Sequence, residues 1–147
     1  MSHSRKRARQ AAVQALYQWQ LTKSNITDID QQFRVEHEGS QTDLDYFSEV
    51  LRGVTATASE LDKLFTPYLE WPIDEINPVE LAVLRLACYE LKHRLDVPVG
   101  VILNESVDLT KRFGAEQGHK FVNGVVDRVA KDLRCDERAA RISKKNR

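Results

Sequence analysis

The sequence predicts an all-α protein of about seven helices. Apolar residues recur every three or four positions through most of the chain, which is the spacing of one helix face. Glycine and proline are scarce, with six and four among 147 residues, and no segment alternates as a half-buried strand does. A chain of this length supports one compact core. We therefore expect one helical domain over residues 1–134 and a basic, flexible tail over residues 135–147.

The first half contains three expected helices. The first covers about residues 5–21, and one of its faces carries Val13, Leu16, Tyr17 and Gln20. Continued backwards, this face passes through Arg9 and Lys6, so we expect its cationic end to extend beyond the core. Thr27 with Asp30, and Thr42 with Asp45, have the spacing of a capping box and predict the next two helix starts.

The second half contains four more expected helices. An apolar stripe from Leu61 to Leu69 ends near Trp71. Asn77 and Pro78 form the clearest helix start, because Asn caps well and Pro suits the first helical position. Glu80 is then placed to reach back toward free backbone N–H groups. The last two helices begin at Pro98 and at about residue 116, with Gly114 separating them.

The formal charge is zero, but the two signs are separated along the chain. A basic head consists of Arg5, Lys6, Arg7 and Arg9, and five further cations lie in the tail after Glu137. Without these nine, 13 basic residues face 22 acidic ones, so the middle of the chain carries −9. This separation favours an anionic ligand at one surface and a basic partner at another.

Several classes of function lack any supporting motif. Cys88 and Cys135 are far apart, and the four histidines are dispersed, so we expect no disulfide framework and no metal site. No phosphate loop, nucleophile elbow or kinase motif is present, and no apolar run is long enough for a membrane span. We expect a cytoplasmic protein that is not an enzyme and needs no cofactor.

Two segments have the residue types of a single-stranded RNA site. The basic head places four cations within two helical turns, where they can surround an irregular backbone, although a solvated terminus explains it equally well. Lys120, Phe121 and Asn123 combine a cation, an aromatic ring and an amide, the mixture that contacts phosphates and bases. The alternative is that Phe121 packs in the core with Val122 and Val125.

The chain resembles the NusB family over nearly all of residues 5–134. The resemblance rests on an ordered set of motifs, namely RAR at 7–9, AVQALYQW at 12–19, ELAVLR at 80–85, YEL at 89–91, VP at 97–98, ILNE at 102–105, FG at 113–114 and KFVNGV at 120–125. It implies a fold of two three-helix groups packed across one another. It also implies a heterodimer with NusE, a basic small-subunit ribosomal protein, which binds boxA RNA of nascent ribosomal RNA transcripts and joins RNA polymerase with other Nus factors.

The resemblance also implies roles for individual residues. Matching positions for RNA are Arg5, Lys6, Arg7, Arg9 and Phe121, followed by Lys120 and Asn123, and those for NusE are Tyr17 and Glu80. Gln117 and Gly118 depart from the family's more polar pair, which leaves the tuning of RNA affinity open. Open as well are the role of the basic tail and whether a free homodimer hides the RNA surface. Two rivals remain, an RNA-binding domain of a ribosomal RNA cytosine methyltransferase and a protein-only adaptor.

Overall fold

The computed structural model describes residues 2–135 and 137, which fold into helices without any strand. The first half contains α1 (Ser2–Thr22), α2 (Ile26–Glu36) and α3 (Leu44–Ala56). A connecting region contains α4 (Ala58–Phe65) and two 3-10 helices, η1 (Thr66–Tyr68) and η2 (Ile73–Glu75). The second half contains α5 (Pro78–His93), α6 (Val99–Phe113) and α7 (Gly118–Leu133). The predicted all-α class and its seven α-helices are confirmed over this part of the chain.

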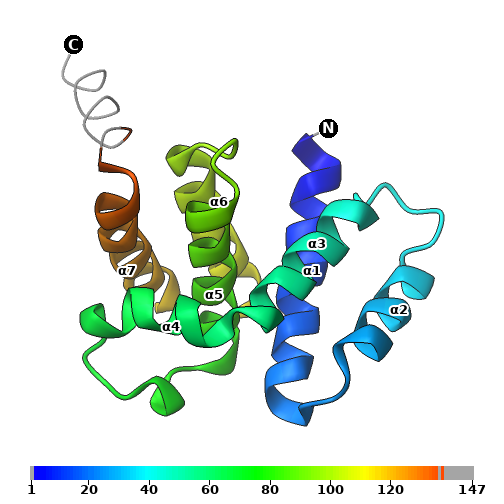
Figure 1. The fold of residues 1–147 in the computed structure, drawn as a ribbon, viewed down its shortest axis with the longest axis horizontal. Helices are drawn as coiled ribbons and strands as arrows, with labels where there is room; N and C mark the ends of the chain where they lie inside the picture. The colour runs from blue at the N-terminus through cyan, green and yellow to red at the C-terminus, as the bar shows by residue number, and fades with distance from the viewer. Residues whose placement is uncertain (1, 136, 138–147) are drawn as a thin grey trace.

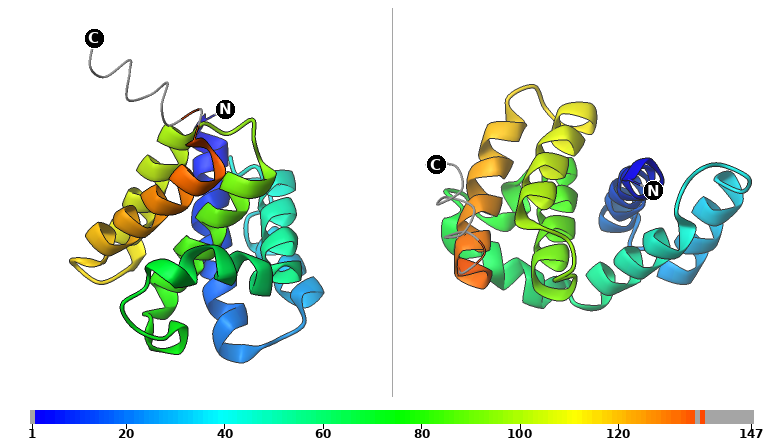
Figure 2. Two further views of the ribbon diagram at one scale, coloured as in Figure 1. Left: turned by 60° about the vertical axis from the view of Figure 1, so that its left-hand side comes forward. Right: turned by 90° about the horizontal axis from the view of Figure 1, so that it is seen from above.

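The helices form two groups of three that meet along α1 and α5. Figure 1 shows α1, α2 and α3 on the right and α5, α6 and α7 on the left, with α4 running beneath the second group. The view from above in Figure 2 keeps the two groups apart in the same way. Because α1 packs on α5 as extensively as α5 packs on α6, the two groups share one continuous core.

Small residues let the helices at this junction approach closely. The face of α1 that meets its neighbours is rich in fully buried alanines, namely Ala8, Ala11, Ala12 and Ala15. On α3, Gly53 lies under the ring of Tyr89 of α5, where a Cβ atom would come within 2.3 Å of that ring. The larger side chains that fill the remaining space come mainly from α3 and α5, including Phe47, Leu51, Leu84, Leu86 and Leu91.

The side chains that cap α2, α3 and α5 agree with the sequence prediction at α5 and differ from it at the other two. The Asn77 side chain caps α5 by accepting hydrogen bonds from the N–H groups of Val79 and Glu80, as predicted. The capping roles predicted for Thr27 and Thr42 are wrong, because Asn25 caps α2 and Asp43 caps α3. A short polar side chain within two residues of the predicted cap competes for the same free N–H groups, and sequence spacing does not decide between them.

Replacing the fully buried Leu84 by alanine is expected to lower the free energy of unfolding by ~2–5 kcal/mol, because the change leaves a cavity in the shared core. Urea denaturation measures the loss. Leu95→Ala is the matched control, since Leu95 is 71% exposed and its truncation leaves no cavity. Equal effects of the two substitutions would contradict the placement of Leu84.

Candidate RNA and partner interface

The basic end of α1 is anchored by a buried ion pair between Arg9 and Glu90. The Arg9 guanidinium donates to both carboxylate oxygens of Glu90 on α5, with Nη2 at 2.9 Å from Oε2, and the residues are only 3% and 2% exposed. The prediction that α1 extends beyond the core at Arg9 is therefore wrong. Glu90, an acid among the mostly apolar buried residues of α5, receives the cation, so the core continues past this position.

Tyr46 of α3 completes this buried cluster. Its hydroxyl donates to Glu90, and burial together with the neighbouring Glu90 carboxylate raises the pKa of Tyr46 well above its usual range. Glu105 of α6 lies at 3.7 Å from Nη1 of Arg9 and adds a second negative charge. Burial lowers the pKa of Arg9, but these acids more than offset that effect, so the guanidinium stays charged. Four helices thus contribute to one cluster of charged and polar side chains.

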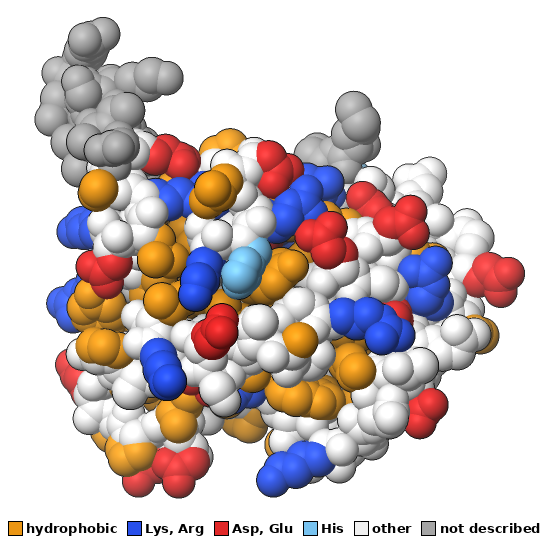
Figure 3. Space-filling view, viewed as in Figure 1, with side chains coloured by type: hydrophobic (Ala, Val, Ile, Leu, Met, Phe, Trp, Pro, Cys, Tyr) orange, Lys and Arg blue, Asp and Glu red, His pale blue; other side chains and the backbone are white. Residues whose placement is uncertain are grey.

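The remaining cations of the basic head differ in the contacts that they make with the rest of the chain. Lys6 bridges Glu105 and Asp108 of α6 at 3.1 and 3.2 Å, and Arg5 stacks over the Tyr46 ring at 4.2 Å from its centroid. Arg7 is exposed and makes no ion pair with any described residue. The space-filling view accordingly shows cations interspersed with acids rather than one unbroken positive patch (Figure 3).

The second RNA candidate lies at the start of α7. Lys120 and Asn123 are exposed there, while Val122 and Val125 face the core, as the alternative interpretation of this segment required. Phe121 is half-buried and makes an edge contact with Trp71, with ring centroids 6.4 Å apart. The segment follows the carboxyl end of α6, whereas the basic head contacts α6 at Glu105 and Asp108. An RNA strand that contacts both candidates must therefore run along α6.

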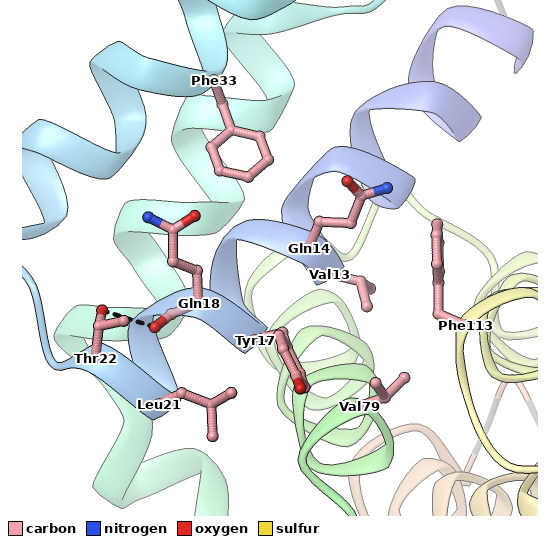
Figure 4. Close-up of a pocket in the computed structure, with 9 residues that line it drawn as sticks. All are labelled: Val13, Gln14, Tyr17, Gln18, Leu21, Thr22, Phe33, Val79 and Phe113. Atoms are coloured by element: carbon pink, nitrogen blue, oxygen red, sulfur yellow. Dashed lines mark hydrogen bonds between the residues drawn. The ribbon is translucent and has the colours of Figure 1, made fainter.

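Tyr17 lines an open apolar groove of about 620 Å³ beside α1 (Figure 4). The groove is formed by one face of α1 together with Phe33, Val79 and Phe113, each from a different helix. Tyr17 is 38% exposed and Leu21 is 56% exposed, so both present apolar surface to solvent. Such an exposed apolar patch is typical of a protein interface.

Glu80 is buried beside the first turn of α7 instead of reaching back to its own helix. A Cβ atom on Gly118 would come within 2.4 Å of its Oε2, so only glycine leaves room for the carboxyl group there. Glu80 is 8% exposed and makes no ion pair or side-chain hydrogen bond with any described residue, and burial raises its pKa. Its neighbour Val79 lines the Tyr17 groove, so the two predicted partner residues occupy adjoining hollows.

Besides the buried cluster around Glu90, sequence reasoning missed Trp71 and Arg134. The exposed Trp71 lies against Phe121, although the sequence places it only at the end of an apolar stripe. Arg134 is buried and donates to the carbonyl groups of Glu90, Leu91, Arg94 and Val97, so it closes the carboxyl end of α5. Glu137 accepts from Arg134 and from the Val99 N–H, which extends the described structure beyond residue 134. The rest of the predicted tail, residues 136 and 138–147, lies outside the described residues.

The described part of the chain offers no group of three or more His, Cys, Asp or Glu side chains suited to a metal ion. None of its helices combines the length and apolarity needed to cross a membrane.

Comparison with known proteins decides the family. The model of the NusB family matches residues 6–131. The chain belongs to the NusB family. It is 49% identical over 133 residues to the transcription antitermination protein NusB of Marinobacter nauticus, covering 90% of this chain and 84% of that protein.

Solved NusB structures share the fold. T. maritima NusB superposes with a TM-score of 0.79 at 32% identity, covering 90% of this chain and 94% of that one. A crystal structure of the antitermination factors NusB and NusE in complex with dsRNA gives the same TM-score at 30% identity, covering 90% and 99%. The predicted arrangement of two three-helix groups is thereby confirmed as the NusB fold.

Arg9→Ala in this NusB-family chain is expected to cost about 3–5 kcal/mol of unfolding free energy, because it strands the buried Glu90 carboxylate without a counter-charge. Arg7→Ala removes an exposed cation from the same helix and should leave stability nearly unchanged. Paired urea titrations compare the two, and similar midpoints would show that the Arg9 pair is dispensable for the fold.

Glu80→Gln is expected to stabilise the protein at neutral pH. The raised pKa of Glu80 means that its carboxyl group ionises less favourably in the folded chain than in the unfolded chain. This loss of stability is absent at a pH below 4.5, the ordinary pKa of a glutamate, and is complete above the folded-state pKa. The gain in melting temperature should therefore appear as the pH rises and vanish in acid. Glu75→Gln, at an exposed site, serves as control. A gain for Glu80→Gln that does not depend on pH would contradict this explanation.

Proposed function

We propose that this chain is a transcription antitermination factor that acts by binding, without catalysis. Together with NusE it recognises boxA-type single-stranded RNA of nascent ribosomal RNA transcripts in the cytoplasm. It then joins the RNA polymerase elongation complex with other Nus factors. The observation that carries this proposal is the near-half identity to a transcription antitermination protein NusB over 84% of that protein's length.

The charged and aromatic residues form the proposed RNA surface. Arg5, Lys6 and Arg7 at the start of α1 would contact phosphates, and Lys120, Phe121 and Asn123 would contact a base and its neighbouring backbone. Arg9 was also predicted to contact RNA, but its guanidinium is engaged with Glu90. We therefore assign Arg9 the role of positioning the helix that carries the other cations.

The Tyr17 groove supplies a surface for NusE. Tyr17 and Leu21 offer exposed apolar area, and the acidic middle of the chain complements a basic protein. The Tyr17 groove is distinct from the hollow beside the basic head, whereas Glu80, the second residue proposed for NusE, lines one pocket with Phe121. The proposed RNA and NusE surfaces would therefore meet at that pocket. This arrangement favours the antitermination role over a protein-only adaptor, because Arg7, Lys120 and Asn123 are all exposed.

The proposal is tested by titrating a boxA-type RNA and a scrambled strand into the chain, with and without NusE, at two salt concentrations. We expect tighter binding to the boxA-type strand, strengthened by NusE and weakened by salt. Equal binding to both strands that ignores NusE would overturn the antitermination role. Measurable methyl transfer to RNA would favour the methyltransferase alternative.

Arg7→Ala is expected to weaken RNA binding at low salt and to lower the salt slope by about 0.7, the contribution of one phosphate contact on a single strand. Its affinity for NusE should stay unchanged. Tyr17→Ala should show the opposite pattern, with weaker NusE binding and unchanged RNA affinity of the isolated chain. Isothermal titration calorimetry measures both affinities. Loss of RNA binding in Tyr17→Ala would contradict the separation of the Tyr17 groove from the basic head.

A further inference from the structure

The described chain ends on the side of the molecule that carries the basic head. Figure 1 and the left view of Figure 2 show the last turns of α7 at the same upper end as the start of α1. Glu137, the last described residue, accepts a hydrogen bond of 2.6 Å from the N–H of Val99, the first residue of α6. The residues that follow Glu137 therefore begin beside the N-terminal end of α6.

Buried contacts fix this starting point next to the basic head. Arg134 is 7% exposed and donates to the carbonyl group of Val97, while Glu137 accepts from Arg134 at 3.2 Å. Val97 also lines a hollow of about 490 Å³ together with Arg5 of the basic head. The loop between α5 and α6 thus contacts both the end of the described chain and the head.

The last ten residues of the sequence, 138–147, contain five cations and no acid, and we call them the basic arm. They lie outside the described residues. The cations are Arg138, Arg141, Lys144, Lys145 and Arg147. Ten residues of extended chain span at most roughly 33–36 Å. Glu105, which pairs with Lys6, follows Val99 by six residues, or about 9 Å along the helix axis. The basic arm is therefore long enough to reach a ligand bound at the basic head.

The proposed RNA contacts follow α6 in a fixed order. The candidate residues at the start of α7 come after the C-terminal end of α6, and the basic head contacts the middle of α6 at Glu105 and Asp108. The basic arm begins at the opposite end, beside Val99. An RNA strand that runs along α6, as contact with both candidates requires, therefore continues past the head toward the basic arm.

The composition of the basic arm favours phosphates over bases and over the protein's own acids. It contains no aromatic ring, so it lacks the stacking surface that binds unpaired bases. Its cations bind phosphates without regard to sequence. The acids near the head already have partners, because Glu105 and Asp108 pair with Lys6 and Asp96 pairs with Arg94. Docking of the basic arm on these acids would have to displace those pairs.

We propose that the basic arm binds the phosphates of the nucleotides that flank the boxA-type element, on the side of the basic head away from the start of α7. The arm adds affinity without sequence preference, while the contacts at the head and on α7 select the strand. The inference rests on the proposed function, because that function supplies the RNA.

The test compares the full chain with a chain that ends at Glu137, both at saturating NusE. The RNAs are a boxA-type strand and the same strand extended by uridines at either the 5′ or the 3′ end. For one extension only, the full chain should bind about tenfold more tightly than to the unextended strand at low salt. Truncation should remove this gain and lower the salt slope by at least about 1.4, which is two phosphate contacts at roughly 0.7 each. Equal affinities and slopes of the two chains for every strand would overturn the inference.

Matched substitutions test whether the charge of the basic arm carries the effect. Lys144→Gln combined with Lys145→Gln should lose part of the gain for the extended strand. Lys23→Gln combined with Lys63→Gln removes the same charge from exposed positions on other parts of the molecule and should keep the gain. The melting temperature should stay unchanged in the truncated chain, because the contacts of Arg134 and Glu137 remain. A gain that survives the tail substitutions but not the control pair would contradict the proposal.

The outcomes assign a failure to different levels. If the full chain binds no RNA with or without NusE, the proposed function fails and the inference falls with it. If the truncated chain keeps its preference for the boxA-type strand and binds every extended strand as tightly as the full chain does, the function stands and the inference is overturned. Tighter RNA binding after truncation would also overturn it, because the basic arm then occupies the acids of the head.

Discussion

The ion pair between Arg9 and Glu90 determines where the rest of the basic end lies. It joins α1 to α5, and Tyr46 and Glu105 extend it to α3 and α6, so both three-helix groups meet at one buried charge cluster. Burying two charges is expensive, and the pair repays this cost only because nearly every donor and acceptor finds a partner. The pair also sets the register of α1 against α5, and this register determines which of the neighbouring cations face solvent.

The acids that surround the basic head partly neutralise its positive charge and also hold its side chains in place. Lys6 is shared between Glu105 and Asp108, and Arg94 lies over Tyr46 while it pairs with Glu49 and Asp96. The strong hydrogen bond from Arg94 lowers the pKa of Asp96 to about 2, so this acid stays ionised at any physiological pH. An RNA strand that contacts Lys6 and Arg5 as proposed would have to compete with Glu105 and Asp108 for the first and with the Tyr46 ring for the second. Such competition favours ligands that also contact the aromatic and amide groups of α7. The cations by themselves would not distinguish such ligands from other anions.

Much of the fold follows from local sequence, since helical spacing depends only on neighbouring residues. The seven α-helices and the Asn77 cap were predictable for this reason, whereas the exact caps of α2 and α3 were not, because polar residues one or two positions apart compete. The burial of Arg9 depends on Glu90, 81 positions away, and no periodicity within α1 encodes that partner. An acid within the apolar face of α5 was the one local indication. The contact of Trp71 with Phe121 likewise joins distant segments and became visible only in the folded chain.

The central claim, that Arg9 holds the helix while its neighbours contact RNA, is tested most directly by NMR of the arginine side chains. The Nε–H signals of Arg5, Arg7 and Arg9 are followed as RNA is added to the chain bound to NusE. Because Arg9 Nε donates to both oxygens of Glu90, its proton should exchange slowly with solvent and its signal should stay in place. The Arg5 and Arg7 signals should shift with saturation. An Arg9 signal that exchanges rapidly, or that moves as far as that of Arg7, would show that Arg9 leaves Glu90 to bind RNA and would contradict the account.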